Sequence, residues 1–222
     1  MSYKPLYIRK CKKITHYGEQ LIITELESFI EVGKEIGRED YVVKIDSDVL
    51  FISVDIFQEV LKSGKDAIGQ ACDYWEPFIY FQGGCYFIKG SLISELRNFD
   101  RTILQEVLTA MNNETARKRQ RFCHDLPEDA VIYYFIKTKT DKINLRDFYG
   151  TQDDLYNLSK KFSVIHFERS RTRMTKTGLL ELALIRRCCI NSGIFGIFLM
   201  RAIKAIRKVK RFVRKFPAKA YG

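Results

Sequence analysis

Two aspartates interrupt an otherwise apolar stretch, YVVKIDSDVLFI, at Tyr41–Ile52. Asp46 and Asp48 are two residues apart, so in an extended strand both side chains point to the same face. Burying two like charges this close together is costly unless a positive group lies between them. A divalent cation such as Mg²⁺ or Mn²⁺ would supply that charge and would also bind a diphosphate. The alternative is that both carboxylates only start a turn or cap a helix.

A glycine pair and an acidic pair follow further along the chain. Gly83 and Gly84, in QGGCYFIKG, would let another molecule approach the backbone closely, although such pairs usually mark a turn. Glu128 and Asp129 follow a proline and precede the apolar run AVIYYF, which indicates a helix start. Carboxylates at that position either complement the helix dipole or hold a general base in a fixed place.

A histidine and a group of arginines come last, in SVIHFERSR. A histidine in an apolar strand is more often a core residue than a ligand. His166 could instead bind a metal, with Arg169 and Arg171 binding a phosphate behind it.

In this order, the four motifs resemble those of the GT-A glycosyltransferases, which use nucleotide sugars. The matching segments are DSD at 46–48, GG at 83–84, PED at 127–129 and VIHF at 164–167, and the resemblance covers about residues 18 to 170. YFQGGCYFIKG and PEDAVI look most like the inverting, fringe-type and galactosyltransferase-like branch. The resemblance implies transfer of a sugar from a nucleotide diphosphate donor to a glycan or lipid-linked acceptor.

For the metal and the donor, the resemblance implies a site for Mn²⁺ or Mg²⁺. Asp48 would bind the ion directly, and Asp46 would reach it through water or would contact the nucleotide ribose. His166 would be the third protein ligand. Arg169 and Arg171 would stabilise the leaving diphosphate.

For the sugars, the resemblance implies that Asp129 is the base that deprotonates the acceptor hydroxyl, with Glu128 beside it. Gly83, Gly84 and Trp75 would border the donor or acceptor sugar. A base opposite the leaving nucleotide is what a single inverting displacement needs.

The elements that must position these residues alternate between strands and helices, which predicts an α/β fold. The predicted helices cover residues 18–36, 54–62, 92–97 and 129–138, and residues 100–123 are expected to form a helix followed by a basic loop. The predicted strands cover 41–52, 67–71 and 162–167, and residues 75–87 could hold two more, with the glycine pair between or inside them. The resemblance refines this to a GT-A-like mixed sheet flanked by helices. Only 45 residues precede Asp46, so we expect part of the N-terminal nucleotide-binding unit to be missing.

The positive charge is confined to the end of the chain. The formal net charge is +11, but eleven of the 38 lysines and arginines follow Glu181, the last acidic residue, and residues 1–181 therefore carry 27 basic and 27 acidic side chains. A neutral body argues against nucleic acid as a partner. Six cysteines without a CxxC pair, and the lack of a signal peptide, predict a cytoplasmic protein with reduced thiols.

The basic tail predicts a second region. We expect a GT-A-like domain at 1–178 and a basic amphipathic tail at 179–222, in which Leu199, Ile206 and Val209 share a helical face opposite most of the lysines and arginines. This pattern is typical of a helix that binds an anionic membrane surface peripherally. The alternatives are a helix packed on the domain and a nucleic-acid-binding tail.

Together these features predict a metal-dependent, inverting glycosyltransferase at a membrane surface. One alternative is a degenerate relative that binds without transferring. The other is a basic peripheral membrane or nucleic-acid-binding protein in which the carboxylates are structural. Convergence of Asp46, Asp48 and His166 on one point would favour the enzyme.

Overall fold

The structure is a computed structural model that describes residues 19–73, 79–96, 101–117, 128–166 and 175–213. The chain divides into two compact units. Unit 1 comprises Met1–Val43 and Lys65–Leu145, and unit 2 comprises Lys44–Gly64 and Arg146–Gly222. Each unit combines a β-sheet with helices, so the predicted α/β class is confirmed. Within the described part of the chain, no helix is long and apolar enough to cross a bilayer.

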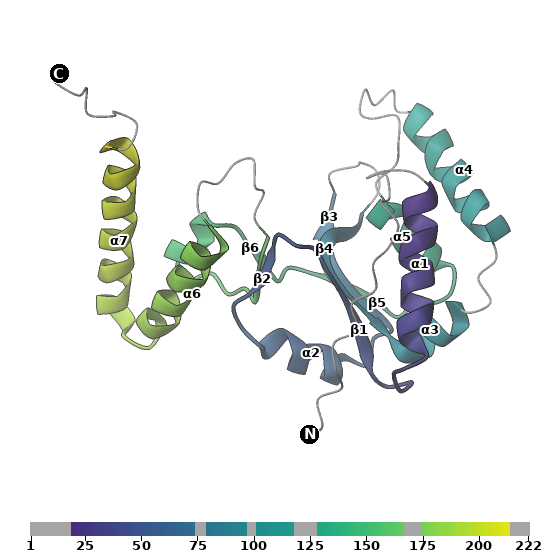
Figure 1. Cartoon of the computed structure of the whole chain (residues 1–222), viewed down its shortest axis with the longest axis horizontal. Helices are drawn as coiled ribbons and strands as arrows, with labels where there is room; N and C mark the ends of the chain where they lie inside the picture. The colour runs from purple at the N-terminus through teal and green to yellow at the C-terminus, as the bar shows by residue number, and fades with distance from the viewer. Residues whose placement is uncertain (1–18, 74–78, 97–100, 118–127, 167–174, 214–222) are drawn as a thin grey trace, which may run out of the picture. The chain divides into compact units, whose positions relative to one another are not determined.

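Unit 1 is built around a four-stranded sheet with the strand order β1-β4-β3-β5. The strands are β1 (Tyr41–Ile45), β3 (Ala67–Cys72), β4 (Tyr80–Lys89) and β5 (Ile143–Arg146). The helices of this unit are α1 (Glu19–Gly33), α3 (Gly90–Leu96), α4 (Arg101–Arg117) and α5 (Glu128–Lys137). Figure 1 shows α1, α3 and α5 on the same side of this sheet.

The core of unit 1 forms where α5 packs on β4 and α1 packs on α3 and α5. The apolar run after Glu128 and Asp129 supplies buried side chains from α5, among them Val131 and Phe135, and β4 supplies Phe81 and Tyr86. Each large apolar side chain that is fully buried contributes about 1.5 to 3 kcal/mol to folding. The core therefore fixes the first turn of α5 over the middle of β4.

The prediction of one strand over residues 41–52 was wrong. The stretch forms two strands, β1 and β2 (Val49–Phe51), which belong to different sheets. Between them, the backbone N–H of Val49 donates a hydrogen bond to the carbonyl of Asp46 at 3.2 Å, which closes a tight turn. The two aspartates thus occupy a turn, where the alternating geometry of a strand does not apply.

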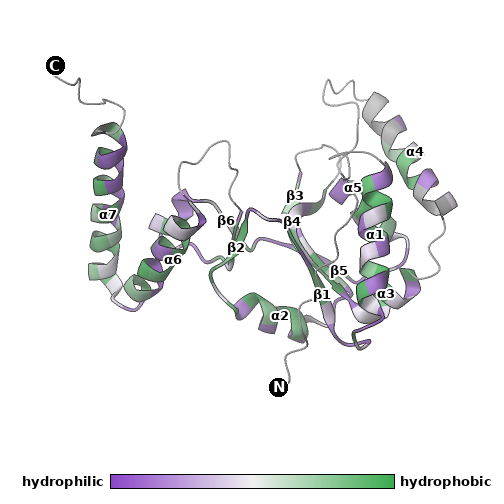
Figure 2. Ribbon diagram, viewed as in Figure 1, coloured by the Kyte–Doolittle hydropathy of each residue, from purple (hydrophilic) through white to green (hydrophobic). Residues whose placement is uncertain are grey.

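Unit 2 contains a three-stranded sheet with the order β2-β7-β6. Its remaining elements are α2 (Asp55–Ser63), β6 (Tyr149–Gly150), the 3-10 helix η1 (Asp153–Tyr156), β7 (Val164–His166), α6 (Lys176–Ile190) and α7 (Gly193–Val213). The helix α6 packs on η1 and α7, and the core of this unit includes Leu179 and Leu182 from α6 and Met200 from α7. Figure 2 shows hydrophobic residues at the start of α7 and both kinds of residue along the rest of it.

A buried arginine ties α6 to the segment that leads into β7. Only 4% of Arg186 is exposed, and burial lowers the pKa of its guanidinium. Its Nη1 donates to the carbonyls of Asp154 (2.7 Å) and Asn157 (2.5 Å), and its Nη2 donates to the carbonyl of Lys160. Its guanidinium carbon lies 4.4 Å from the centroid of the Phe162 ring. Arg186 thus donates to three backbone carbonyls, one of which, that of Asp154, also accepts from the N–H of Asn157 at 3.0 Å.

Candidate functional site

In unit 2, the pairing of β2 with β7 brings Asp48 and His166 together. The two strands are antiparallel, with Val49 opposite His166, so the residue before Val49 lies beside the histidine. Nε2 of His166 is 3.4 Å from Oδ1 of Asp48, and both side chains are half-buried. Tyr149, on the neighbouring strand β6, places its ring centroid 6.0 Å from that of His166.

The distance between Asp48 and His166 fits two ligands of one small divalent ion. Ligand atoms at about 2.1 Å from such an ion are separated by about 3.0 Å in octahedral and about 3.4 Å in tetrahedral geometry. An imidazole nitrogen and a carboxylate oxygen are donors that Mn²⁺ accepts. The same distance also fits an ion pair between Asp48 and a protonated His166.

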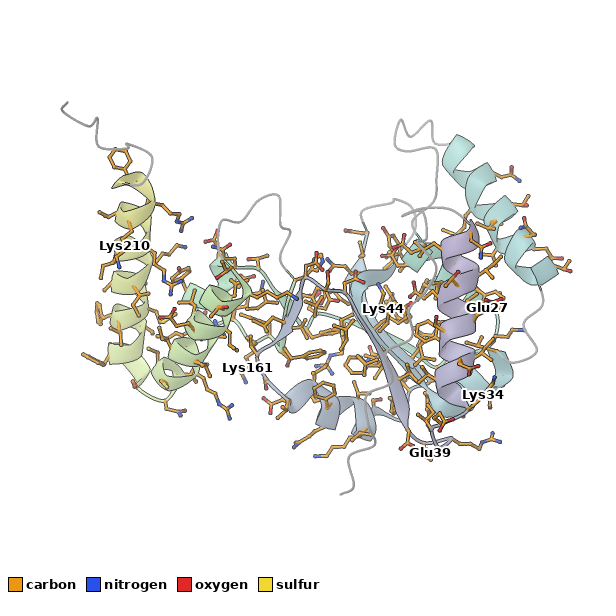
Figure 3. The ribbon with its side chains drawn as sticks, in the orientation of Figure 1. Glu27, Lys34, Glu39, Lys44, Lys161 and Lys210 are labelled. Carbon is orange, nitrogen blue, oxygen red and sulfur yellow. The ribbon has the colours of Figure 1, made fainter. Side chains whose placement is uncertain are left out.

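Asp46 makes a different contact. Its Oδ1 lies 2.8 Å from Nζ of Lys44, a residue of β1 that is labelled in Figure 3. Lys44 is the last residue but one of β1 and Asp46 directly follows that strand, so their closeness in sequence could have suggested the pair. Among the described residues, no group of three or more histidine, cysteine, aspartate or glutamate side chains is placed to hold a metal. The pair Asp48–His166 would leave the other coordination positions to water or to substrate phosphates.

In unit 1, the predicted glycine pair lies in an irregular part of the β3–β4 ladder. Between the pairs Gly69↔Tyr86 and Ala71↔Phe81, β3 advances two residues while β4 advances five. The segment Gln82–Cys85 therefore forms a large bulge inside a single strand. The sequence had left open whether the glycines lie within one strand or separate two strands. Bulges re-aim the chain locally and are common next to active sites.

The bulge brings Gly83 against Asp129. A Cβ atom added to Gly83 would lie 2.9 Å from Oδ2 and 3.2 Å from Cγ of Asp129. Only glycine lets the strand approach the carboxylate this closely. The other carboxylate oxygen, Oδ1, accepts a hydrogen bond of 3.0 Å from the N–H of Ala130 in the first turn of α5. Asp129 is thus held between a helix N-terminus and a strand bulge.

A buried tyrosine lies near the same acidic pair. Only 2% of Tyr80 is exposed. Burial, a hydrogen bond with Cys72 and the negative charges of Asp129 and Glu128 together raise the pKa of its hydroxyl, which stays protonated at neutral pH. Tyr80 was not among the predicted site residues, because only the pairing of β3 with β4 places Cys72 opposite it.

Three predicted site residues, Trp75, Arg169 and Arg171, lie outside the described residues. Among the predicted site residues that the structure describes, two pairs are in contact: Asp48 with His166 in unit 2, and Gly83 with Asp129 in unit 1. Gly84 is buried in the bulge beside Gly83, and Glu128 precedes Asp129 at the start of α5. In the comparisons with known proteins, no protein-family model matches this chain and no curated protein matches it.

Proposed function

We propose that the chain is a metal-dependent, inverting glycosyltransferase of the GT-A type. It moves a sugar from a nucleotide diphosphate donor to a glycan or lipid-linked acceptor at a membrane surface. The approach of Asp48 to His166, at 3.4 Å, is the observation that carries the proposal. These two side chains come from distant parts of the sequence and meet with a spacing suited to Mn²⁺ or Mg²⁺.

The proposal assigns a separate role to each of four residues. Asp48 and His166 would hold the ion, which would supply positive charge for the departing nucleoside diphosphate. As the resemblance implies, Asp129 of unit 1 would be the base that removes the proton from the acceptor hydroxyl in a single inverting displacement. The configuration of the sugar is therefore inverted. Gly83 supports this role of Asp129, because it packs against the carboxylate and limits its movement.

Membrane association is the second part of the proposal. The helix α7 carries lysines and arginines and no acidic residue over Gly193–Val213, so it is attracted to anionic lipid. A peripheral position on the cytoplasmic side would bring the enzyme to a lipid-linked acceptor.

Electron paramagnetic resonance of Mn²⁺ tests the metal site without requiring the sugar to be known. Free Mn²⁺ gives a signal that falls as the ion binds, and it can be titrated with the protein in the presence of a panel of nucleoside diphosphates. We expect Asp48→Asn and His166→Gln each to weaken Mn²⁺ binding at least about tenfold, because even residues that only orient metal ligands contribute that much.

Asp55→Asn is the matched control. It removes an exposed carboxylate from the first turn of α2 in the same unit, and it should leave Mn²⁺ binding unchanged. Equal Mn²⁺ binding in wild type, Asp48→Asn and His166→Gln would show that Asp48 and His166 form only an ion pair. The enzymatic proposal would then be rejected.

A second candidate function is nucleotide binding without transfer. The ion pair between Lys44 and Asp46 favours it. Lys44 already supplies positive charge to Asp46, which is one of the two carboxylates that the resemblance assigns to the metal site. Metal-dependent nucleotide binding, combined with no release of nucleoside diphosphate from a panel of nucleotide sugars, would support this function over the first.

A further inference from the structure

The helices α6 and α7 form a close hairpin, defined here as residues 176–213, with an exposed apolar end. Gly193 begins α7 with a φ of 53°. A Cβ added to Gly196 would lie 2.0 Å from the carbonyl oxygen of Cys189, so only glycine permits the two helices to approach this closely. Met200 is completely buried in the core of unit 2. The first turns of α7 are therefore firmly placed against α6.

The apolar end of the hairpin, called the tip, comprises residues 190–199. Phe195 is 72% exposed and Phe198 is 63% exposed. The other exposed apolar side chains of the tip are Ile190, Ile194, Ile197 and Leu199. The tip contains no charged residue. Large apolar side chains gathered at one exposed end are unusual in a soluble unit and indicate an interaction surface.

The second half of α7 has a different character. Residues 201–213 carry six basic side chains: Arg201, Lys204, Arg207, Lys208, Lys210 and Arg211. Lys210, labelled in Figure 3, belongs to this half. Among the side chains described here, the large apolar ones that are exposed are those of Ile206, Val209 and Phe212. The helix thus changes along its length from uncharged to strongly basic.

Two long ion pairs connect this basic half with other elements of unit 2. Lys204 lies 3.9 Å from Asp153 of η1, and Arg207 lies 3.8 Å from Glu181 of α6. Nζ of Lys204 also lies 5.4 Å from the centroid of the Tyr156 ring. The basic half is therefore kept beside polar groups of its own unit, whereas the exposed side chains of the tip are apolar.

We infer that the tip enters the acyl layer of one leaflet of an anionic bilayer, while residues 201–213 lie among the headgroups. This inference rests on the proposed membrane association and specifies which part of the hairpin enters. In the tip, Ile194, Phe195, Ile197 and Phe198 are consecutive or nearly so, and they therefore surround much of the helix. A helix lying flat in the interface needs only one apolar stripe along its whole length.

The dimensions and the charge agree with a leaflet as the partner. The uncharged segment Gly193–Met200 rises about 11 Å along the helix axis, at about 1.5 Å per residue. This length fits within the hydrocarbon half of a bilayer, which is about 15 Å thick. A second copy of the chain is a poorer partner, because the basic halves of two α7 helices would repel each other, whereas anionic headgroups attract them.

Depth-dependent fluorescence quenching tests the inference. Trp75 is the single tryptophan of the chain, so Trp75→Phe provides a background for Phe195→Trp, Phe198→Trp and Phe212→Trp. Vesicles contain equal parts of phosphatidylcholine and phosphatidylglycerol, brominated either deep in the acyl chains or near the headgroups. We expect the tryptophans at 195 and 198 to be quenched most by deep bromine, and the tryptophan at 212 to be quenched most by shallow bromine.

Equal quenching depths at the three positions would overturn the inference and support a helix lying flat. Binding to the vesicles without quenching at 195 and 198 would also overturn it, since another surface would then make the contact. Failure of the intact chain to sediment with the vesicles at low salt would reject membrane association as a whole. In that case, gel filtration would show whether the tip joins two copies.

A pair of double variants provides the matched comparison. Phe195→Ser with Phe198→Ser should weaken vesicle binding about tenfold or more even at low salt, because two large apolar side chains no longer enter the lipid. Leu180→Ser with Leu184→Ser changes two exposed apolar residues of α6 away from the tip and should leave binding unchanged. An equal loss in both double variants would contradict a specific role for the tip.

Discussion

The contact between Gly83 and Asp129 predicts an energetic coupling between the bulge of β4 and the proposed base. In Gly83→Ala, the new Cβ would lie 2.9 Å from Oδ2 and 3.2 Å from Cγ of Asp129. Both distances are too short for ordinary contact, so the carboxylate must rotate away. That rotation would disturb its 3.0 Å hydrogen bond with the N–H of Ala130.

The magnitude follows from these two effects. A lost hydrogen bond of this kind costs about 0.5 to 1.5 kcal/mol, and overpacking by one methyl group costs about 1 to 3 kcal/mol. We expect Gly83→Ala to lower the free energy of unfolding by about 1 to 3 kcal/mol. In an Asp129→Ala background, Oδ2 and Cγ are absent and only the contact with Cβ, at 3.3 Å, remains. There the same substitution should cost clearly less.

Urea denaturation of the four proteins of this double-mutant cycle measures the coupling. We expect a coupling of about 1 kcal/mol or more, and additivity within about 0.5 kcal/mol would refute the reasoning. A parallel cycle of Gly83→Ala with Glu128→Ala is the control. It removes the neighbouring carboxylate of the same helix turn but leaves the Asp129 atoms that face Gly83, so the two changes should be additive.

Two further predictions concern the reaction and the fold of unit 2. Asp129→Asn should lower the rate of sugar transfer about 10²-fold or more, the usual contribution of a positioned base, and should leave Mn²⁺ binding unchanged. A near-normal rate would show that another residue is the base. A product of retained configuration, detected by NMR, would exclude inversion. Arg186→Met should lower the free energy of unfolding by about 2 to 3 kcal/mol, because three hydrogen bonds of about 1 kcal/mol each are lost while the Asp154 carbonyl keeps its bond from the N–H of Asn157. Thermal unfolding followed by circular dichroism checks this, with the exposed Arg187→Met expected to change it by less than about 0.5 kcal/mol.

The helices that carry the strongest local signals could be predicted closely. The helices expected at 54–62 and 129–138 correspond to α2 at Asp55–Ser63 and α5 at Glu128–Lys137. In both cases an acidic residue stands in the first turn and a lysine in the last turn, which complements the helix dipole. Such signals lie within a few residues of the element that they define, and no knowledge of the tertiary structure is needed to use them.

Strand boundaries depended on partners that are distant in sequence. Residues 41–52 have the composition of one strand, yet β1 joins the sheet of β4 and β2 joins that of β7. The hydrogen bond from Val49 to Asp46 that separates them reflects these two pairings. The bulge of β4 could not be predicted from the sequence either, because a bulge is defined by the register of β4 against β3.

The tail shows a similar limit. The structure has the helix α7 over Gly193–Val213, and Leu199, Ile206 and Val209 are exposed on it. Periodicity did not reveal that Met200 enters the core of unit 2, or that Arg186, in the preceding helix, binds three backbone carbonyls. Both contacts depend on residues outside the tail.

The two aspartates show why spacing alone does not assign a shared role. In a continuous strand, Asp46 and Asp48 would face one point and would repel each other unless a cation joined them. The turn separates them instead: Asp46 pairs with Lys44 near the end of β1, and Asp48, just before β2, pairs with His166 on the neighbouring strand β7. Each carboxylate thereby gains its own positive or ionisable partner. Charge compensation for Asp46 is therefore structural, and the case for a bound cation depends on Asp48 and His166.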